Sequence, residues 1–375
     1  METVAAVECQ SYNEEEVYLA VKKAIERSGF ILPENITVLI KPNIMTQNRP
    51  DQHTVTHHTV VSALCQILKE QKCRIIIGES SAFYQKGLTR KAFLMSGMDK
   101  VAEKFDAKLI AFEEEPLIRI EKNLKGLTEI YVPGILLAVD MVINVGKLKT
   151  HGSLRLAGAI KNIYGCLPGG YKQKIHRLTK NEFELSDVFI DLHHLVKPSL
   201  SIMDAIVSLD GGPTALGRPV RTSRIFASTN AAALDVIAAR MIGYQPEELP
   251  ILIEAKKRGM IDSFEDIEVL GSYESVPFKK LVKKDLHRAF NKNSIFVKDT
   301  NVELAISPSR CKICETCISA CPVGAITENA GQIQLDTASC ISCYYCLSVC
   351  PEKAILIKPS FMNKLIRGIR WIAQI

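Results

Sequence analysis

CKICETCISACP at residues 311–322 and CISCYYCLSVCP at residues 340–351 repeat one arrangement of four cysteines followed by a proline. In each run, two residues separate the first cysteine from the second and the second from the third, and three residues separate the third from the fourth. Three closely spaced thiolates can surround one face of an iron–sulfur cluster, and this spacing is the ligand run of bacterial-type clusters. The repeat therefore predicts two 4Fe-4S clusters.

The fourth ligand of each cluster must come from outside its cysteine triplet. In proteins with two such runs, the fourth cysteine of each run ligates the other cluster. We assign to the first cluster Cys311, Cys314, Cys317 and Cys350. We assign to the second cluster Cys340, Cys343, Cys346 and Cys321. Structural zinc is the alternative, but zinc takes two separated pairs of ligands, whereas this chain supplies contiguous triplets.

Residues 301–358 resemble a bacterial-type dicluster ferredoxin domain over their whole length. The resemblance implies one-electron transfer at low potential and a redox partner protein. Cluster thiolates need a reducing compartment, so we expect a cytoplasmic protein. No apolar run is long enough to span a bilayer and no signal peptide opens the chain, which agrees with this expectation.

Composition limits the remaining function classes. The chain has 375 residues, of which 47% are hydrophobic, and a formal net charge of +6. This length allows one large domain and one small domain. We find no basic stripe interleaved with aromatic residues, so we do not expect a nucleic-acid partner. The modest positive charge favours an anionic ligand or an acidic redox partner.

Apolar and basic residues alternate at helical spacing in residues 359–375. The pattern predicts an amphipathic basic helix. We expect this helix to dock on its own protein, and contact with a membrane surface is the alternative.

Residues 1–300 alternate short β-branched apolar runs with longer helical patterns. This alternation predicts an α/β domain, with a mainly parallel sheet covered by helices, beside the small α+β ferredoxin domain. The expected strands are 36–40, 74–77, 108–112, 141–145, 200–204, 224–227 and 267–270. The expected helices include 14–28, 59–71, 99–105, 185–196 and 231–242.

Polar and Gly-rich segments follow four of these strands, at residues 41–43, 78–81, 146–151 and 210–213. In open α/β sheets, ligands bind outside the carboxyl ends of the strands. We therefore expect one basic cleft at the strand ends. The candidate ligand-binding residues are Lys41, Asn43, Glu79, Asn144, Lys161, Asn162, His176 and Asp210.

The density of lysine and histidine in this predicted cleft favours a carboxylate or phosphate ligand. Lys147, Lys149 and His151 are the catalytic candidates, because they can neutralise developing charge and donate protons. The acids Glu79, Asp204 and Asp210 could instead hold a divalent metal, act as bases or pair with the lysines. The signatures of Rossmann, Walker and nucleophile-elbow sites are missing, which leaves any additional cofactor in the cleft unknown.

The order of these motifs is similar to that of the domain of unknown function family 362. The resemblance covers most of residues 1–300 and rests on Lys41-Pro42-Asn43, Gly78-Glu79-Ser80, Asn144 with 147–151, Lys161-Asn162 with Tyr164-Gly165, 210–213 and 233–235. Members of that family are often fused to a dicluster ferredoxin and are frequent in anaerobes. The resemblance implies a shared cleft around the motifs and supplies no substrate.

Three functions are compatible with these features. In the first, an iron–sulfur oxidoreductase passes single electrons to or from an anionic small molecule or cofactor bound in the cleft. In the second, the state of the clusters changes ligand affinity without turnover. In the third, the chain is an electron-transfer subunit without catalysis of its own. We favour the first, because an electron carrier is fused to a basic ligand-binding domain.

Overall fold

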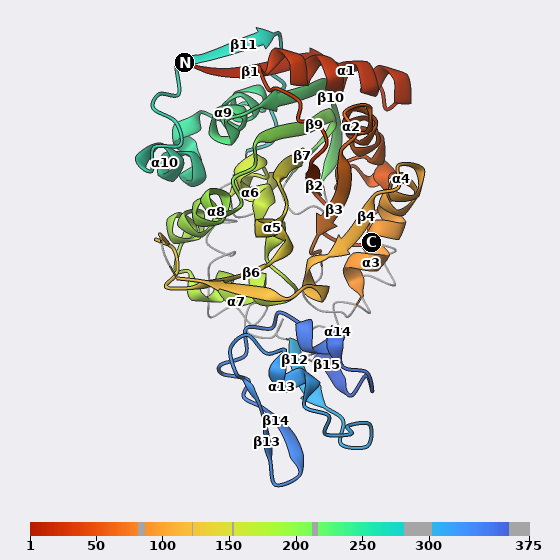
Figure 1. Ribbon diagram of the computed structural model, residues 1–375. Helices are drawn as coiled ribbons and strands as arrows, with labels where there is room; N and C mark the ends of the chain where they lie inside the picture. Colours follow the sequence, from red (N-terminus) through yellow and green to blue (C-terminus); the bar gives the residue numbers. More distant parts are fainter. Residues whose placement is uncertain (82–86, 122, 152–153, 212–216, 281–301, 360–375) are drawn as a thin grey trace.

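The computed structural model describes residues 1–375 except 82–86, 122, 152–153, 212–216, 281–301 and 360–375 (Figure 1). Within the described residues, a nine-stranded sheet has the order β11-β1-β10-β9-β7-β2-β3-β4, and β8 pairs with β7. The strands are β1 (Glu2–Glu8), β2 (Thr37–Pro42), β3 (Arg74–Glu79), β4 (Lys108–Ala111), β7 (Met141–His151), β8 (Arg155–Leu156), β9 (Leu200–Asp210), β10 (Arg218–Ser228) and β11 (Ile267–Gly271). The pairs β2–β3, β2–β7, β3–β4 and β7–β9 are parallel, which confirms the predicted mainly parallel sheet.

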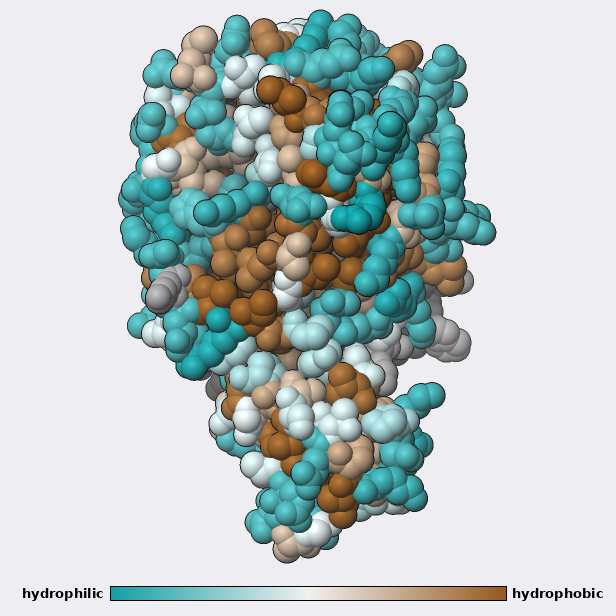
Figure 2. Space-filling model, viewed as in Figure 1, coloured by the Kyte–Doolittle hydropathy of each residue, from teal (hydrophilic) through white to brown (hydrophobic). Residues whose placement is uncertain are grey.

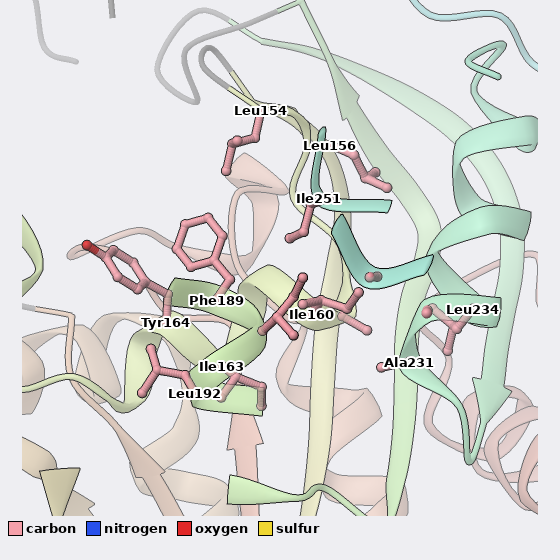
Figure 3. Close-up of a cluster of buried hydrophobic side chains, with 14 of the residues drawn as sticks. Leu154, Leu156, Ile160, Ile163, Tyr164, Phe189, Leu192, Ala231, Leu234 and Ile251 are labelled. Atoms are coloured by element: carbon pink, nitrogen blue, oxygen red, sulfur yellow. The ribbon is translucent and has the colours of Figure 1, made fainter. Parts of the chain in front are cut away.

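Helices cover both faces of this sheet (Figure 1). On one face lie α1 (Glu14–Arg27), α2 (His58–Glu70), α3 (Leu88–Ser96) and α4 (Met98–Lys104). On the other lie α6 (Ala159–Asn162), α8 (Glu182–Val196), α9 (Ala231–Met241) and α10 (Pro250–Lys257). Because strand side chains alternate between faces, Val38 and Ile40 join the first core and Leu39 joins the second. Figure 3 shows part of the second core, where α6 and α8 meet.

The predicted helices agree closely with the observed ones, because capping residues mark their ends. Asn13, Asn181 and Asn230 accept backbone N–H bonds at the starts of α1, α8 and α9. Gly243, with a φ of 85°, follows α9 in the left-handed conformation that ends helices.

Two strands extend well beyond their predicted ends, and the expectation of loops there was wrong. Residues 146–151 and 205–210 continue β7 and β9, so that Lys147 pairs in register with Asp204 and Lys149 with Leu209. A register shift separates these two pairs. The lysines of this segment favoured a loop in the sequence-based prediction. In the structure, hydrogen-bond acceptors from other segments surround these lysines, so they lie in a buried strand. Strand β1 was not predicted.

The large domain also contains several shorter elements. They are η2 (Phe112–Glu114), β5 (Leu117–Ile120), β6 (Ile130–Pro133), α5 (Ile135–Ala138), η3 (Ile163–Cys166) and α7 (Tyr171–Leu178). Of these, β6 and α7 lie at the end that faces the small domain (Figure 1). In Figure 2, hydrophobic side chains gather across the middle of the visible face of the large domain. The small domain shows a more mixed surface.

The small domain contains two antiparallel strand pairs, as expected for an α+β ferredoxin domain. Strand β12 (Val302–Ile306) pairs with β15 (Ile355–Pro359), and β13 (Ile326–Asn329) pairs with β14 (Gln332–Leu335). Two short helices, α13 (Thr316–Ser319) and α14 (Tyr345–Val349), contain the third cysteine of each run. The predicted basic helix over 359–375 lies outside the described residues apart from Pro359, which ends β15. None of the described helices combines the length and the apolar character needed to cross a membrane.

Candidate functional site

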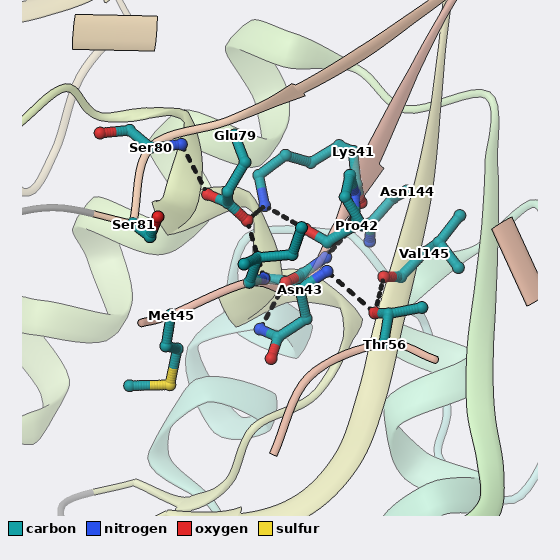
Figure 4. A network of polar contacts seen from close by, with 12 residues as sticks. Lys41, Pro42, Asn43, Met45, Thr56, Glu79, Ser80, Ser81, Asn144 and Val145 are labelled. Carbon is teal, nitrogen blue, oxygen red and sulfur yellow. Dashed lines mark hydrogen bonds and ion pairs between the residues drawn. The ribbon is translucent and has the colours of Figure 1, made fainter. Parts of the chain in front are cut away.

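Lys41 and Glu79 form a buried ion pair at the ends of the neighbouring strands β2 and β3 (Figure 4). Lys41 Nζ lies 2.7 Å from Glu79 Oε2 and also donates to the carbonyl oxygen of Pro42. The carboxylate accepts further bonds from the backbone N–H groups of Ile44 and Ser80. Gly165 packs so closely that a Cβ there would lie 2.2 Å from Glu79 Oε1. Lys41 is therefore already neutralised by a partner within the protein.

Three predicted amide ligands form a continuous chain beside this pair. Asn43 Nδ2 donates to Asn162 Oδ1 at 2.8 Å, and Asn162 Nδ2 donates to Asn144 Oδ1 at 2.7 Å. Asn144 Nδ2 in turn donates to the carbonyl oxygen of Ala159. The structure thus brings together side chains from the end of β2, from β7 and from α6.

Lys147 lies in a second buried ion pair, on the face of the sheet covered by α1 and α2. Its Nζ is 2.9 Å from Asp204 Oδ2 and donates to the Tyr12 hydroxyl at 2.7 Å. The Tyr12 hydroxyl donates to Asp204 Oδ1, and the His57 backbone N–H donates to Asp204 Oδ2. The Tyr12 and His57 rings stack with centroids 3.8 Å apart. Sequence reasoning missed Tyr12, since nothing in its local sequence indicates this contact with β7 and β9.

Lys149 is fully buried, with no carboxylate bound to it within the described residues. Its Nζ donates to Thr54 O at 2.6 Å, to Asn43 Oδ1 at 2.7 Å and to Met45 Sδ at 3.3 Å. Burial, together with the charges of Lys161 and Lys147, holds the pKa of Lys149 well below its ordinary value. Lys149 therefore belongs to a region where positive charge is incompletely compensated.

Lys161, His151 and His176 lie close enough for their charges to interact. His176 is exposed to solvent, and Lys161 and His151 are half-buried. Burial nevertheless lowers the pKa of His176 to about 4 and that of Lys161 to about 8, and holds the pKa of His151 well below its ordinary value. All three side chains therefore lie in surroundings that disfavour their charged forms.

We call these three residues, with Lys149 and Lys172, the basic recess. Lys172 is buried and its Nζ donates to Ser80 O, while burial lowers the pKa of Lys172 to about 8. Lys161 has no hydrogen bond or ion pair to any described residue and lies 5.9 Å from the centroid of the Phe189 ring. The rings of Tyr164 and Phe189 meet edge to face, as Figure 3 shows. The basic recess therefore lies beside aromatic rings.

Asp210 makes different contacts from the other predicted site residues. Its carboxylate binds Arg218 at 3.2 Å and accepts the backbone N–H of Lys279 at 2.8 Å. These contacts tie the end of β9 to the segment that follows β11. Gly211, next to Asp210, donates its backbone N–H to Thr150 Oγ1 at 3.0 Å, so Asp210 lies near the end of β7, although it has no described bond to another predicted site residue.

Glu113, in η2, is a buried acid that the sequence did not indicate. Its side chain is 5% exposed, and neither carboxylate oxygen has a hydrogen-bond partner among the described residues. Burial raises the pKa of Glu113 above its ordinary value. A carboxyl group in this state destabilises the fold when it is ionised.

We expect Glu113→Gln to stabilise the protein by about 1 kcal/mol near neutral pH, because it removes a buried charge. The folded-state pKa is raised, so the penalty grows as pH rises from the unfolded pKa through the folded one and is full above it. The thermal midpoint of the cluster-loaded variant should therefore exceed that of the wild type more at alkaline than at acidic pH. Glu114→Gln is the matched control, because Glu114 is paired with Arg90. Equal midpoints for the wild type and Glu113→Gln at all pH values would contradict the assignment.

The eight cysteines of the two runs line two separate cavities. The first is lined by Cys311, Cys314, Cys317 and Cys350. The second is lined by Cys321, Cys340, Cys343 and Cys346. Backbone N–H groups of Ala325 and Ala354 point at Cys321 Sγ and Cys350 Sγ, at 3.2 and 3.3 Å. Four thiolates, apolar walls and N–H donors to sulfur fit a 4Fe-4S cluster in each cavity.

Comparison with known proteins agrees with both parts of this geometry. A family model described as "Domain of unknown function (DUF362)" matches residues 38–240, more than half of the chain. The chain belongs to this family. A "4Fe-4S dicluster domain" model matches residues 303–351 of the DUF362 chain. The chain therefore binds 4Fe-4S clusters and has an iron–sulfur electron-transfer role. A domain of this type implies a redox partner of some kind.

Two individual proteins resemble this DUF362 chain. The thylakoid-associated protein sll1697 of Synechocystis sp. (strain ATCC 27184 / PCC 6803 / Kazusa) is 26% identical over 265 residues, which are 69% of this chain and 80% of the relative. The structure of the lactate racemase apoprotein from Thermoanaerobacterium thermosaccharolyticum aligns with a TM-score of 0.41 and 12% identity. That alignment covers 64% of this chain and 57% of the racemase, less than two thirds of its length.

Proposed function

We propose that this protein transfers single electrons between its iron–sulfur clusters and an anionic small molecule bound in the basic recess. The observation that carries the proposal is the state of Lys161, a solvent-reached cation whose pKa is depressed and which has no carboxylate partner among the described residues. An anion would offset the charge of Lys161 and Lys172. The carboxylate-paired Lys41 and Lys147 instead hold the strand ends in place.

In this proposal the cysteines, lysines and histidines have different roles. The cysteines of the two cavities hold the clusters, which supply one-electron chemistry when bound. Lys161 and Lys172 hold the anion by charge, and Lys149 contributes from beneath them. His176, with its pKa lowered to about 4, is neutral near pH 7 and can exchange a hydrogen bond or a proton with the ligand. We propose the same role for His151.

Anion binding should weaken as pH rises through about 8, because Lys161 and Lys172 then lose their charge. Both lysines are protonated below that pKa and neutral above it. We expect the affinity for sulfate, measured by calorimetry on the cluster-loaded protein, to fall by about tenfold or more between pH 6.5 and 9.5. Sulfate keeps its charge over this range, so the change reports the protein.

Lys161→Met should abolish most of this binding and its pH dependence. Lys104→Met is the matched control, because Lys104 is an exposed lysine paired with Glu14 on the surface. Sulfate affinity that is unchanged in Lys161→Met, or that does not vary with pH in the wild type, would overturn the proposal.

A further inference from the structure

The second cysteine run packs directly on the first turn of α7 in the large domain. The Gly170 backbone N–H donates to Ser342 O at 2.8 Å, and Lys174 Nζ donates to Cys340 O at 3.0 Å and to Ala338 O at 3.1 Å. Gly169 has a φ of 51°, and a Cβ there would lie 2.6 Å from Cys343 O. Close backbone contact of this kind requires glycine.

The two runs differ sharply in their surroundings although their spacing is identical. Ile341 and Cys343, 6% and 8% exposed, belong to the hydrophobic core of the large domain. Tyr344 is also buried, and its hydroxyl lies against Gly170. In the first run, Cys314 is exposed and Ile313 is 40% exposed. One cavity therefore adjoins the large domain, while the other has a ligand residue at the surface.

The same turn of α7 also leads to the basic recess. The Gly169 backbone N–H donates to Ser80 Oγ at 3.0 Å, and Lys172 Nζ donates to Ser80 O. Lys172 and His176, on the same helix as Lys174, belong to the basic recess. A short chain of hydrogen bonds and helix backbone thus connects the second cysteine run to the proposed anion site.

We infer that the cavity lined by Cys321, Cys340, Cys343 and Cys346 exchanges electrons with the basic recess across the first turn of α7. The cavity lined by Cys311, Cys314, Cys317 and Cys350 exchanges them with a one-electron redox protein that approaches the Cys314 side. We call these the inner and outer cavities. One electron lost by the redox protein is gained by the bound anion, or the reverse, and this exchange makes or breaks no bond. The inference rests on the proposed function, because it requires an anion in the recess.

Redox titration monitored by electron paramagnetic resonance tests this order on the full, cluster-loaded chain. Cys314→Ser removes one thiolate of the outer cavity and identifies which signal belongs to it. Negative charge disfavours reduction of a nearby group. Saturating sulfate should therefore lower the midpoint potential of the inner signal and leave the outer one in place.

Lys174→Met and Lys312→Met form a matched pair of substitutions. Lys174 donates to the inner run, and Lys312 lines the outer cavity. We expect Lys174→Met to lower the midpoint of the inner signal alone and to reduce its response to sulfate, and Lys312→Met to affect the outer signal alone.

The outcomes separate the two proposals. If calorimetry detects sulfate binding while sulfate shifts the midpoint of the outer signal, or of neither signal, the assigned order of the cavities is overturned and the anion site survives. If Lys174→Met shifts the midpoint of the outer signal, the contact with α7 has been assigned to the wrong cavity. If calorimetry detects no sulfate binding to the wild type, the proposed function fails and this inference fails with it.

Discussion

Replacing Asp204 with asparagine is expected to lower the free energy of unfolding by about 3–5 kcal/mol, because it leaves a buried lysine without its counter-charge. The side chains of Lys147 and Asp204 are both 0% exposed. Burial by itself disfavours ionised Asp204, but the charge and hydrogen bond of Lys147 and the N–H of His57 outweigh it, so the pKa of Asp204 lies below its usual range. An asparagine keeps the shape and loses this compensation.

The effect has a pH dependence of known sign. Because the folded pKa of Asp204 is depressed, its contribution to stability is present above the unfolded pKa and is lost as pH falls through the folded one. Denaturant unfolding of the cluster-loaded protein, followed anaerobically by circular dichroism, should show the largest difference between wild type and Asp204→Asn near neutral pH. The two should converge in acid.

Two further variants isolate the buried charge as the cause. Asp51→Asn breaks an ion pair whose side chains are 62% and 65% exposed, and we expect no measurable change from it. The double replacement Lys147→Met with Asp204→Leu removes both charges and should recover most of the lost stability. If Asp204→Asn proves no more harmful than Asp51→Asn, the pair is solvated in solution, and Asp204 is not what permits Lys147 in the buried strand β7.

Pairs of cysteine replacements should distinguish crossed from uncrossed ligation with a large difference in iron content. Cys314→Ser with Cys350→Ser removes two residues that line the same cavity, although they come from different runs. We expect this variant to keep about half of the wild-type iron and sulfide, because the other four thiolates are untouched.

Cys314→Ser with Cys321→Ser removes two residues of one run that line different cavities. We expect this variant to lose most of its iron, because each cluster loses one ligand. Iron and acid-labile sulfide per chain, measured after anaerobic purification, provide the comparison. The reverse ranking of the two variants would show that each run ligates its own cluster.

Features set by neighbouring residues were predictable from the sequence. The helix expected over 14–28 is observed as Glu14–Arg27, because its apolar period and its Asn13 cap lie within one short segment. The strand starts at Arg74, Lys108, Met141 and Leu200 were also predicted. The ends of β7 and β9 were not, because the partner that permits Lys147 in a buried strand is Asp204, 57 positions away.

The candidate site shows the same division. The sequence indicated that lysines, histidines and asparagines follow the strands, and the structure joins Asn43, Asn144 and Asn162 in one chain. The sequence could not show which lysines already have a carboxylate partner. Lys41 and Lys147 look like Lys161 in the sequence, yet two of the three have buried carboxylate partners from other strands.

The sequence by itself determined the family, the class of fold and the iron–sulfur chemistry, because the spacing of ligands and the periodicity of apolar residues are local properties of the chain. Tertiary structure alone decided that Glu113 is a buried acid whose carboxylate has no hydrogen-bond partner among the described residues, that Lys161 has no hydrogen bond or ion pair to a described residue, and that one of two cysteine runs of identical spacing adjoins the large domain. These properties depend on which distant segments pack together, and packing sets the desolvation and the neighbouring charges that give each side chain its chemistry.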